Sequence, residues 1–192
     1  MNTARLIYRS RQFLQTLIST ASVADLELAA SVLAPPQLAL FRRMPASEQA
    51  HALRVLSELI AQGETDPDLF TAALLHDVGK ICSPLQAWER ALIVLTGAIC
   101  PRCLQRWGAQ ERLSPGESID RLGWRRPFVV AVQHPVWGAQ LAASCNASRR
   151  AVALILRHQE KLASGGIQGV TPEDRRFETD LLRKLQHVDD NN

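Results

Sequence analysis

The sequence predicts an all-α protein. Apolar residues recur with helical spacing along most of the chain, whereas the alternation of apolar and polar residues that marks half-buried strands is almost absent. Prolines also stand where helices begin, because Asp66-Pro67-Asp68, Ser83-Pro84 and Thr171-Pro172-Glu173 each place a capping residue before a proline suited to the first helical position. We therefore expect a bundle of helices without a sheet.

The expected helices follow one another along the chain with mostly short connections. The stretch 47–62 is amphipathic, and 67–78 and 84–99 begin at the prolines just described. Two longer stretches, 107–124 and 163–170, contain Ser-Pro-Gly and repeated glycines and are expected to be loops. The expected helices are 3–20, 23–34, 36–43, 47–62, 67–78, 84–99, 126–145, 148–162 and 172–189.

Length and composition indicate one soluble domain with an extension. The 192 residues carry a net charge of +3, with 46% hydrophobic and 21% charged residues, which is typical of globular proteins. Residues 1–45 hold no candidate ligand and are expected to form an N-terminal helical extension, whereas 46–192 form the main domain. The arginines are dispersed, so we expect no nucleic-acid binding.

Hydropathy and cysteine content bear on location. The most apolar segment, Ala91 to Cys100, is far shorter than the roughly 20 residues that cross a bilayer. Polar Gln15, Thr16 and Ser19 interrupt the apolar N-terminal stretch, so we expect no signal peptide. Four cysteines are few for this length. We therefore expect reduced thiols, a cytoplasmic location and no membrane association.

An adjacent His-Asp pair stands at the end of an apolar run, in Ala72-Ala73-Leu74-Leu75-His76-Asp77-Val78-Gly79-Lys80. Imidazole and carboxylate are ligands for metals that activate water, and a carboxylate can bridge two ions about 3.5–4 Å apart. The side chain of Lys80 could place a positive charge at the same site. An isolated pair of this kind is more often structural, with Asp77 and Lys80 as a solvated i,i+3 ion pair.

Three further histidines and one aspartate are candidate ligands, because each lies in or at the end of an apolar or amphipathic stretch. His51 lies near an apolar helix stripe with Arg54 one turn later, His134 precedes a proline at an expected helix break, and His158 follows an apolar run. Each histidine alone would more often be a packing or turn residue than a ligand. Asp189 follows the last amphipathic stretch, where acids near a C-terminus are usually solvated.

Taken in order, these residues resemble the H…HD…H…H…D signature of the HD superfamily of metal-dependent phosphohydrolases, over about residues 47–190. The HDxGK form at His76 and the His-Pro-Val-Trp-Gly-Ala stretch at His134 resemble the members that bind two metal ions. The resemblance implies an HD-domain helical bundle in which Asp77 bridges the ions. It assigns the first ion to His51, His76, Asp77 and Asp189, and the second to Asp77, His134 and His158.

The same resemblance implies what the site would do. The protein would be a divalent-metal-dependent phosphohydrolase that cleaves a phosphoester or phosphoanhydride bond of a small substrate, such as a nucleotide or dinucleotide, by metal-activated hydroxide. Lys80 would contact the phosphate, and Arg54 would be a second anion contact. Asp190 would replace Asp189 if the register shifted by one residue. Histidine and carboxylate ligands suit Fe, Mn, Co or Zn better than Mg alone. A homodimer is compatible with this interpretation.

Departures from the family pattern indicate which subgroup of the HD superfamily the sequence does not resemble. Residues 158–160 read His-Gln-Glu rather than His-His-Glu and no Gly-Tyr-Pro loop follows, so the HD-GYP type is disfavoured. Two other functions stay open, namely a regulatory protein that senses a nucleotide without turnover and a di-iron oxygenase. Nucleotide binding without hydrolysis would favour the first, and oxygen consumption with reduced iron would favour the second.

One further motif, Cys100-Pro101-Arg102-Cys103, is a CxxC pair. A structural zinc site would need a second pair of ligands, which the sequence lacks. A thioredoxin-like role would need a βαβ context, which is also missing. We therefore expect these cysteines to be structural or incidental.

Overall fold

The computed structural model describes residues 22–109, 113–114, 117, 119–160 and 172–192. Within these residues every regular element is helical and no strand occurs, which confirms the all-α fold class. None of the described helices is both long and apolar enough to span a membrane. The elements in chain order are α2 (Val23–Val32), α3 (Pro35–Phe41), α4 (Ala46–Ala61), α5 (Pro67–Leu75), the 3-10 helix η1 (Val78–Cys82), α6 (Ala87–Ile99), α7 (Pro101–Gly108), the 3-10 helix η2 (Asp120–Arg125), α8 (Arg126–Ser144), α9 (Arg149–Arg157) and α10 (Pro172–Asn191).

The start of α5 is capped as its sequence predicts. The Asp66 carboxylate accepts hydrogen bonds from the backbone N–H groups of Asp68 at 2.9 Å and Leu69 at 3.0 Å, and Pro67 occupies the first turn. These bonds satisfy N–H groups that would otherwise lack partners at a helix start. A short, well-capped helix therefore leads directly to His76, which is its C-cap residue.

Several expectations about helix ends were wrong. α6 begins at Ala87 rather than Pro84, because Glu89 accepts a 2.7 Å hydrogen bond from the backbone N–H of Gln86 and thereby fixes the later start. α7 occupies a stretch to which the sequence assigned no helix. The break expected before Pro135 is absent, since α8 continues through this residue. The expected helix 3–20 and the expected loop 163–170 lie outside the described residues.

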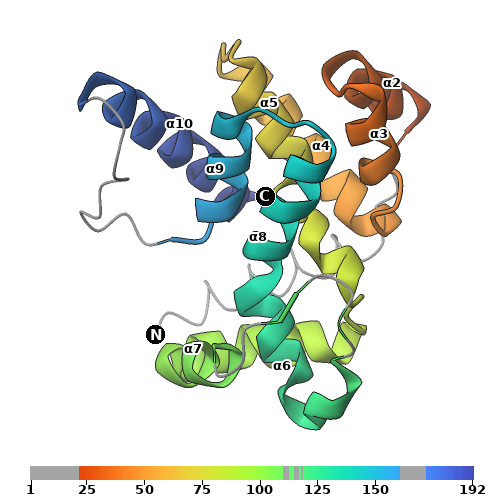
Figure 1. Ribbon diagram of the computed structural model, residues 1–192, viewed down its shortest axis with the longest axis vertical. Helices are drawn as coiled ribbons and strands as arrows, with labels where there is room; N and C mark the ends of the chain where they lie inside the picture. Colours follow the sequence, from red (N-terminus) through yellow and green to blue (C-terminus); the bar gives the residue numbers. More distant parts are fainter. Residues whose placement is uncertain (1–21, 110–112, 115–116, 118, 161–171) are drawn as a thin grey trace.

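Helix α8 runs through the middle of the molecule in Figure 1. Different helices pack against its two ends. α9 and α10 lie on one side, and α5 packs against α4, α9 and α10. α6 and α7 pack against the opposite end of α8, and α2 and α3 pack beside α5 and α8. This arrangement brings the ends of α5 and α9 close to the middle of α8.

A large hydrophobic core joins the first described helices to those that follow. Leu33 and Phe41 belong to the same buried cluster as Leu56 of α4, Leu74 of α5 and Leu185 of α10. Burial of such side chains contributes about 1.5–3 kcal/mol each. The described part of the expected extension therefore packs into the common core, whereas the division of the chain at residue 45 stays a prediction.

A close backbone approach fixes η1 against α8. A Cβ atom added to Gly79 would lie 2.0 Å from the backbone oxygen of His134 and 2.7 Å from the backbone nitrogen of Gly138. A Cβ on Gly138 would in turn lie 3.2 Å from the nitrogen of Gly79. Only glycine fits such an approach without displacing backbone. The contact places the segment after Asp77 directly against the turn of α8 that carries His134.

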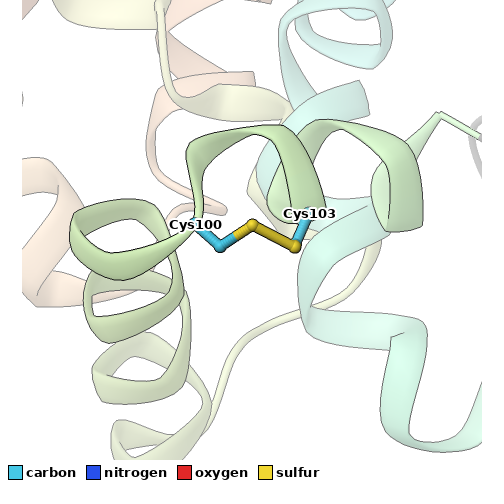
Figure 2. The surroundings of a disulfide bond; sticks show 2 residues. All are labelled: Cys100 and Cys103. Carbon is cyan, nitrogen blue, oxygen red and sulfur yellow. A yellow bond between two sulfur atoms is a disulfide. The ribbon is translucent and has the colours of Figure 1, made fainter.

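The junction between α6 and α7 contains a disulfide bond. Cys100 ends α6 and caps α7, and it is bonded to Cys103 in the first turn of α7 (Figure 2). The expectation of reduced thiols was therefore wrong for this pair. Cys82 and Cys145 are not disulfide-bonded.

Candidate metal centre

Six side chains that are far apart in the sequence meet in the interior of the bundle. They form two groups of three whose ligand atoms each lie within 4.8 Å of one another. The first group is His51, His76 and Asp189, and the second is Asp77, His134 and His158.

The first group joins α4, the end of α5 and the end of α10. Nε2 of His51 lies 2.8 Å from Oδ1 of Asp189, and Nε2 of His76 lies 3.3 Å from the same oxygen. The His76 side chain is fully buried, whereas 25% of the Asp189 side chain is exposed. This group therefore reaches solvent on the side of Asp189.

The second group is built around Asp77, and it is buried throughout. Oδ1 of Asp77 lies 3.1 Å from Nε2 of His134 and 3.9 Å from Nε2 of His158. The other oxygen, Oδ2, lies 3.5 Å from Nε2 of His76 in the first group. The two oxygens of one carboxylate thus face different groups, which is the arrangement that a bridging ligand requires.

Backbone carbonyl groups orient three of the histidines. Nδ1 of His76 donates to the oxygen of Ala73 at 2.9 Å, and Nδ1 of His158 donates to the oxygen of Ile155 at 2.8 Å. Nδ1 of His134 donates to a carbonyl one turn earlier in α8 at 2.9 Å. These bonds leave Nε2 of each ring unprotonated in the neutral tautomer and aimed at the centre, as in metal-binding histidines.

Two of these Nε2 atoms lack satisfactory partners. Nε2 of His76 and Nε2 of His158 are buried without a hydrogen bond of suitable geometry among the described residues. Buried polar atoms in proteins are nearly always satisfied, so such atoms call for an additional partner. These two nitrogens lie beside the carboxylates of Asp77 and Asp189 and the rings of the other two histidines. Such a set of nitrogen and oxygen donors suits a divalent transition metal.

The carboxylates of the centre are held in the charged form. Burial alone would raise the pKa of Asp77, but the positive charges of Lys80 and His76 hold it well below its usual value. Burial likewise opposes the charge on Asp189, whereas His76 and the hydrogen bond from His51 lower the pKa of Asp189. Both acids are therefore charged at neutral pH and available as ligands.

The pKa values of the two buried histidines His76 and His158 are shifted in opposite directions. Burial favours neutral His76, but the negative charges of Asp189 and Asp77 outweigh burial and raise the pKa of His76 well above its usual value. Burial lowers the pKa of His158 to about 3, with help from the nearby His76 and His134. His158 is therefore neutral, whereas His76 carries a proton that a bound metal ion would displace.

Lys80 belongs to a chain of charged side chains beside the centre, in which the two acids are buried and the two cations are partly exposed. Its Nζ lies 2.6 Å from Oδ2 of Asp77 and 3.2 Å from Oε2 of Glu48, and the other oxygen of Glu48 lies 2.5 Å from Nη1 of Arg90. Burial opposes the charge on Lys80, but both acids outweigh it and raise its pKa. The i,i+3 pair of Asp77 and Lys80 is thus largely buried rather than solvated, with 7% of the Asp77 side chain and 25% of the Lys80 side chain exposed. Glu48 and Arg90 were not among the residues predicted from the sequence, because a glutamate in a first helical turn ordinarily faces solvent.

The remaining candidates lie at or outside the edge of the centre. Arg54 is half-buried on α4, with no hydrogen bond or ion pair to another described residue, and burial lowers its pKa. Arg54 therefore forms no hydrogen bond or ion pair with the six ligands. Asp190 and His187 are exposed, so Asp189 rather than Asp190 lies at the centre. Gln159 brings its Nε2 within 3.5 Å of Nε2 of His134.

Comparisons of the sequence with protein-family models and with curated proteins, and of the fold with solved structures, found no match.

Proposed function

We propose that the protein is a divalent-metal-dependent phosphohydrolase of the HD type, acting on a phosphoester or phosphoanhydride bond. The substrate would be a small phosphorylated molecule, with a nucleotide or dinucleotide as the favoured class. The observation that carries this proposal is the placement of Asp77, whose Oδ1 faces His134 and His158 while its Oδ2 faces His76.

The residues fit a pair of ions such as Fe, Mn, Co or Zn. His51, His76 and Asp189 would hold one ion, His134 and His158 the other, and Asp77 both. Such ions supply an activated water molecule and neutralise the charge that develops on phosphoryl oxygens. The unsatisfied Nε2 atoms of His76 and His158 support this assignment independently of the sequence pattern.

The protein side chains would bind and orient the substrate. The Lys80 ammonium keeps its charge beside Asp77 and 25% of its side chain is exposed, so it can reach a phosphoryl oxygen at the margin of the centre. Arg54 would offer a second positive charge to a more distant phosphate. Burial of His134, His158 and Asp77 excludes water from the interior side of the centre, which strengthens these electrostatic interactions.

A metal-reconstitution assay tests the proposal. Chelator-stripped protein would be loaded with Mn²⁺ or Fe²⁺ and incubated with nucleotides, dinucleoside polyphosphates and a chromogenic phosphodiester. We expect metal-dependent hydrolysis that Asp77→Asn lowers by more than about 100-fold, since loss of a single electrostatic contact in a transition state can cost that much. Asp190→Asn, which alters the exposed neighbour of Asp189, should retain activity.

Absence of metal-dependent hydrolysis with every substrate class would contradict the proposal. Tight nucleotide binding without turnover would support the regulatory alternative instead, and oxygen consumption by the iron-loaded protein would support an oxygenase. A cytoplasmic location also stays a prediction, and cell fractionation would test it.

A further inference from the structure

The Cys100–Cys103 disulfide lies outside the candidate metal centre. It bridges the end of α6 and the first turn of α7, and neither helix contributes any of the six candidate ligands (Figure 2). Chemistry at these sulfur atoms would therefore use none of the six candidate ligands.

The backbone around the disulfide is held by hydrogen bonds that do not involve sulfur. The N–H of Cys100 donates to the oxygen of Thr96 at 2.7 Å, which closes the last turn of α6. The N–H groups of Cys103 and Leu104 donate to the oxygen of Cys100 at 3.0 and 3.2 Å, which closes the first turn of α7. In addition, the covalent loop is so short that it restricts the unfolded chain only weakly. The bond can therefore open without loss of the surrounding helices.

The position of Cys100 favours its thiolate form after reduction. Cys100 is the N-cap residue of α7, where backbone N–H groups and the helix dipole stabilise a negative charge. The helix has no acid in its first turn, and Arg102 and Arg106 add positive charge nearby. Cys103 lies farther into the turn and lacks the cap position. Cys100 is therefore the better nucleophile and leaving group of the pair.

The disulfide also lies at a surface that other molecules can reach. Both cysteines are partly exposed, and so are the adjoining Pro101 and Arg102. Before Cys100 in the sequence, Ile99 is 79% exposed, and Leu95, one turn earlier in α6, is 53% exposed. Accessible disulfides of this kind are more readily reduced than those buried in a core.

We propose that Cys100 and Cys103 form a reversible thiol–disulfide exchange site whose reaction partner is a dithiol. A thiolate of the partner would attack one sulfur and form a mixed disulfide, while the bond between Cys100 and Cys103 breaks and releases the other as a thiolate. The second thiolate of the partner would then displace the remaining cysteine. The protein gains two electrons and two protons, and the dithiol becomes a disulfide.

Differential alkylation with peptide mapping tests this proposal on the full-length protein, because mapping distinguishes all four cysteines. The native protein would be equilibrated with dithiothreitol, and then with glutathione buffers of graded ratio. We expect dithiothreitol to reduce the pair in the folded protein, oxidised glutathione to restore the bond, and the far-ultraviolet circular dichroism spectrum to remain unchanged. Reduction only in denaturant, loss of helical signal on reduction, or failure of oxidised glutathione to restore the bond would each overturn the proposal.

Single variants test the assignment of the nucleophile. In Cys103→Ser the Cys100 thiol should react with iodoacetamide about tenfold or more faster at neutral pH than the Cys103 thiol does in Cys100→Ser, since one unit in pKa changes the thiolate fraction about tenfold. The serine in Cys100→Ser is itself a good N-cap, so α7 should remain folded. Equal rates, or a faster Cys103, would overturn the role given to Cys100.

Discussion

At the residue scale, the ionised neighbours of Asp77 determine how the centre behaves without metal. Asp77 lies between the Lys80 ammonium and the His76 ring, and these positive charges compensate for its burial. A divalent ion would replace the proton of His76 as the counter-charge. The same side chains thus balance one another's charges in the metal-free protein and would become ligands when an ion binds.

The raised pKa of His76 predicts pH-dependent metal binding. Because the neutral ring is the ligand and the metal-free protein keeps this ring protonated, binding must release a proton. The affinity for Mn²⁺ should therefore rise with pH at pH values below the raised pKa of His76, by up to about tenfold per pH unit if one proton is released. Calorimetric titrations in buffers of different ionisation enthalpy would measure both the affinity for Mn²⁺ and the number of protons released. An affinity independent of pH would contradict this assignment.

The buried position of Glu48 predicts a loss of stability on its replacement. Glu48 joins Lys80 to Arg90, so Glu48→Gln would leave two partly buried cations with one fewer negative charge. We expect the free energy of unfolding to fall by about 1–3 kcal/mol. Glu58→Gln on the exposed face of the same helix should change it by less than about 0.5 kcal/mol. Urea denaturation of both variants would measure the difference, and equal effects would contradict a structural role for Glu48.

At the scale of elements, the contact between η1 and α8 positions the two groups relative to each other. A side chain at Gly79 would meet the backbone of His134 and Gly138, which cannot move without displacing α8. Gly79→Ala should therefore lower the free energy of unfolding by roughly 2–4 kcal/mol.

Gly97 provides the matched control for this prediction, because a Cβ there would lie 3.5 Å from a side-chain atom of Leu104. Gly97→Ala should be neutral or stabilise the protein by up to about 1 kcal/mol, since alanine favours the helix. Thermal and urea denaturation would compare the two variants. A Gly79→Ala protein as stable as Gly97→Ala would show that the close approach does not constrain the fold.

Local signals explain which elements could be predicted. The cap at Asp66 and the spacing of apolar residues identified α5 and α4, because these features act within one or two turns of the chain. The start of α6 at Ala87 and the presence of α7 were missed, since Ser83-Pro84 offers an equally good local start and α7 is stabilised by packing against α8. Pro135 fits inside α8 for a similar reason, because tertiary packing outweighs its local preference.

At the scale of the whole molecule, the fold brings together ligands that the sequence could only place in order. His51 and Asp189 are 138 positions apart, yet their side chains form a 2.8 Å contact because α10 packs against α4. The pattern of histidines and acids predicted which residues to consider. The contacts of Glu48 and Arg90 could not be predicted, because they depend on the packing of α4 against the segment that carries Lys80.

The most direct test of the two-ion centre is the number and position of metal ions in the protein. Crystals of Mn²⁺-loaded protein would be measured at the manganese absorption edge, so that anomalous scattering locates each ion. We predict two ions, one among His51, His76 and Asp189 and the other between His134 and His158, with one oxygen of Asp77 toward each. A single ion, or none among these six residues, would contradict the account.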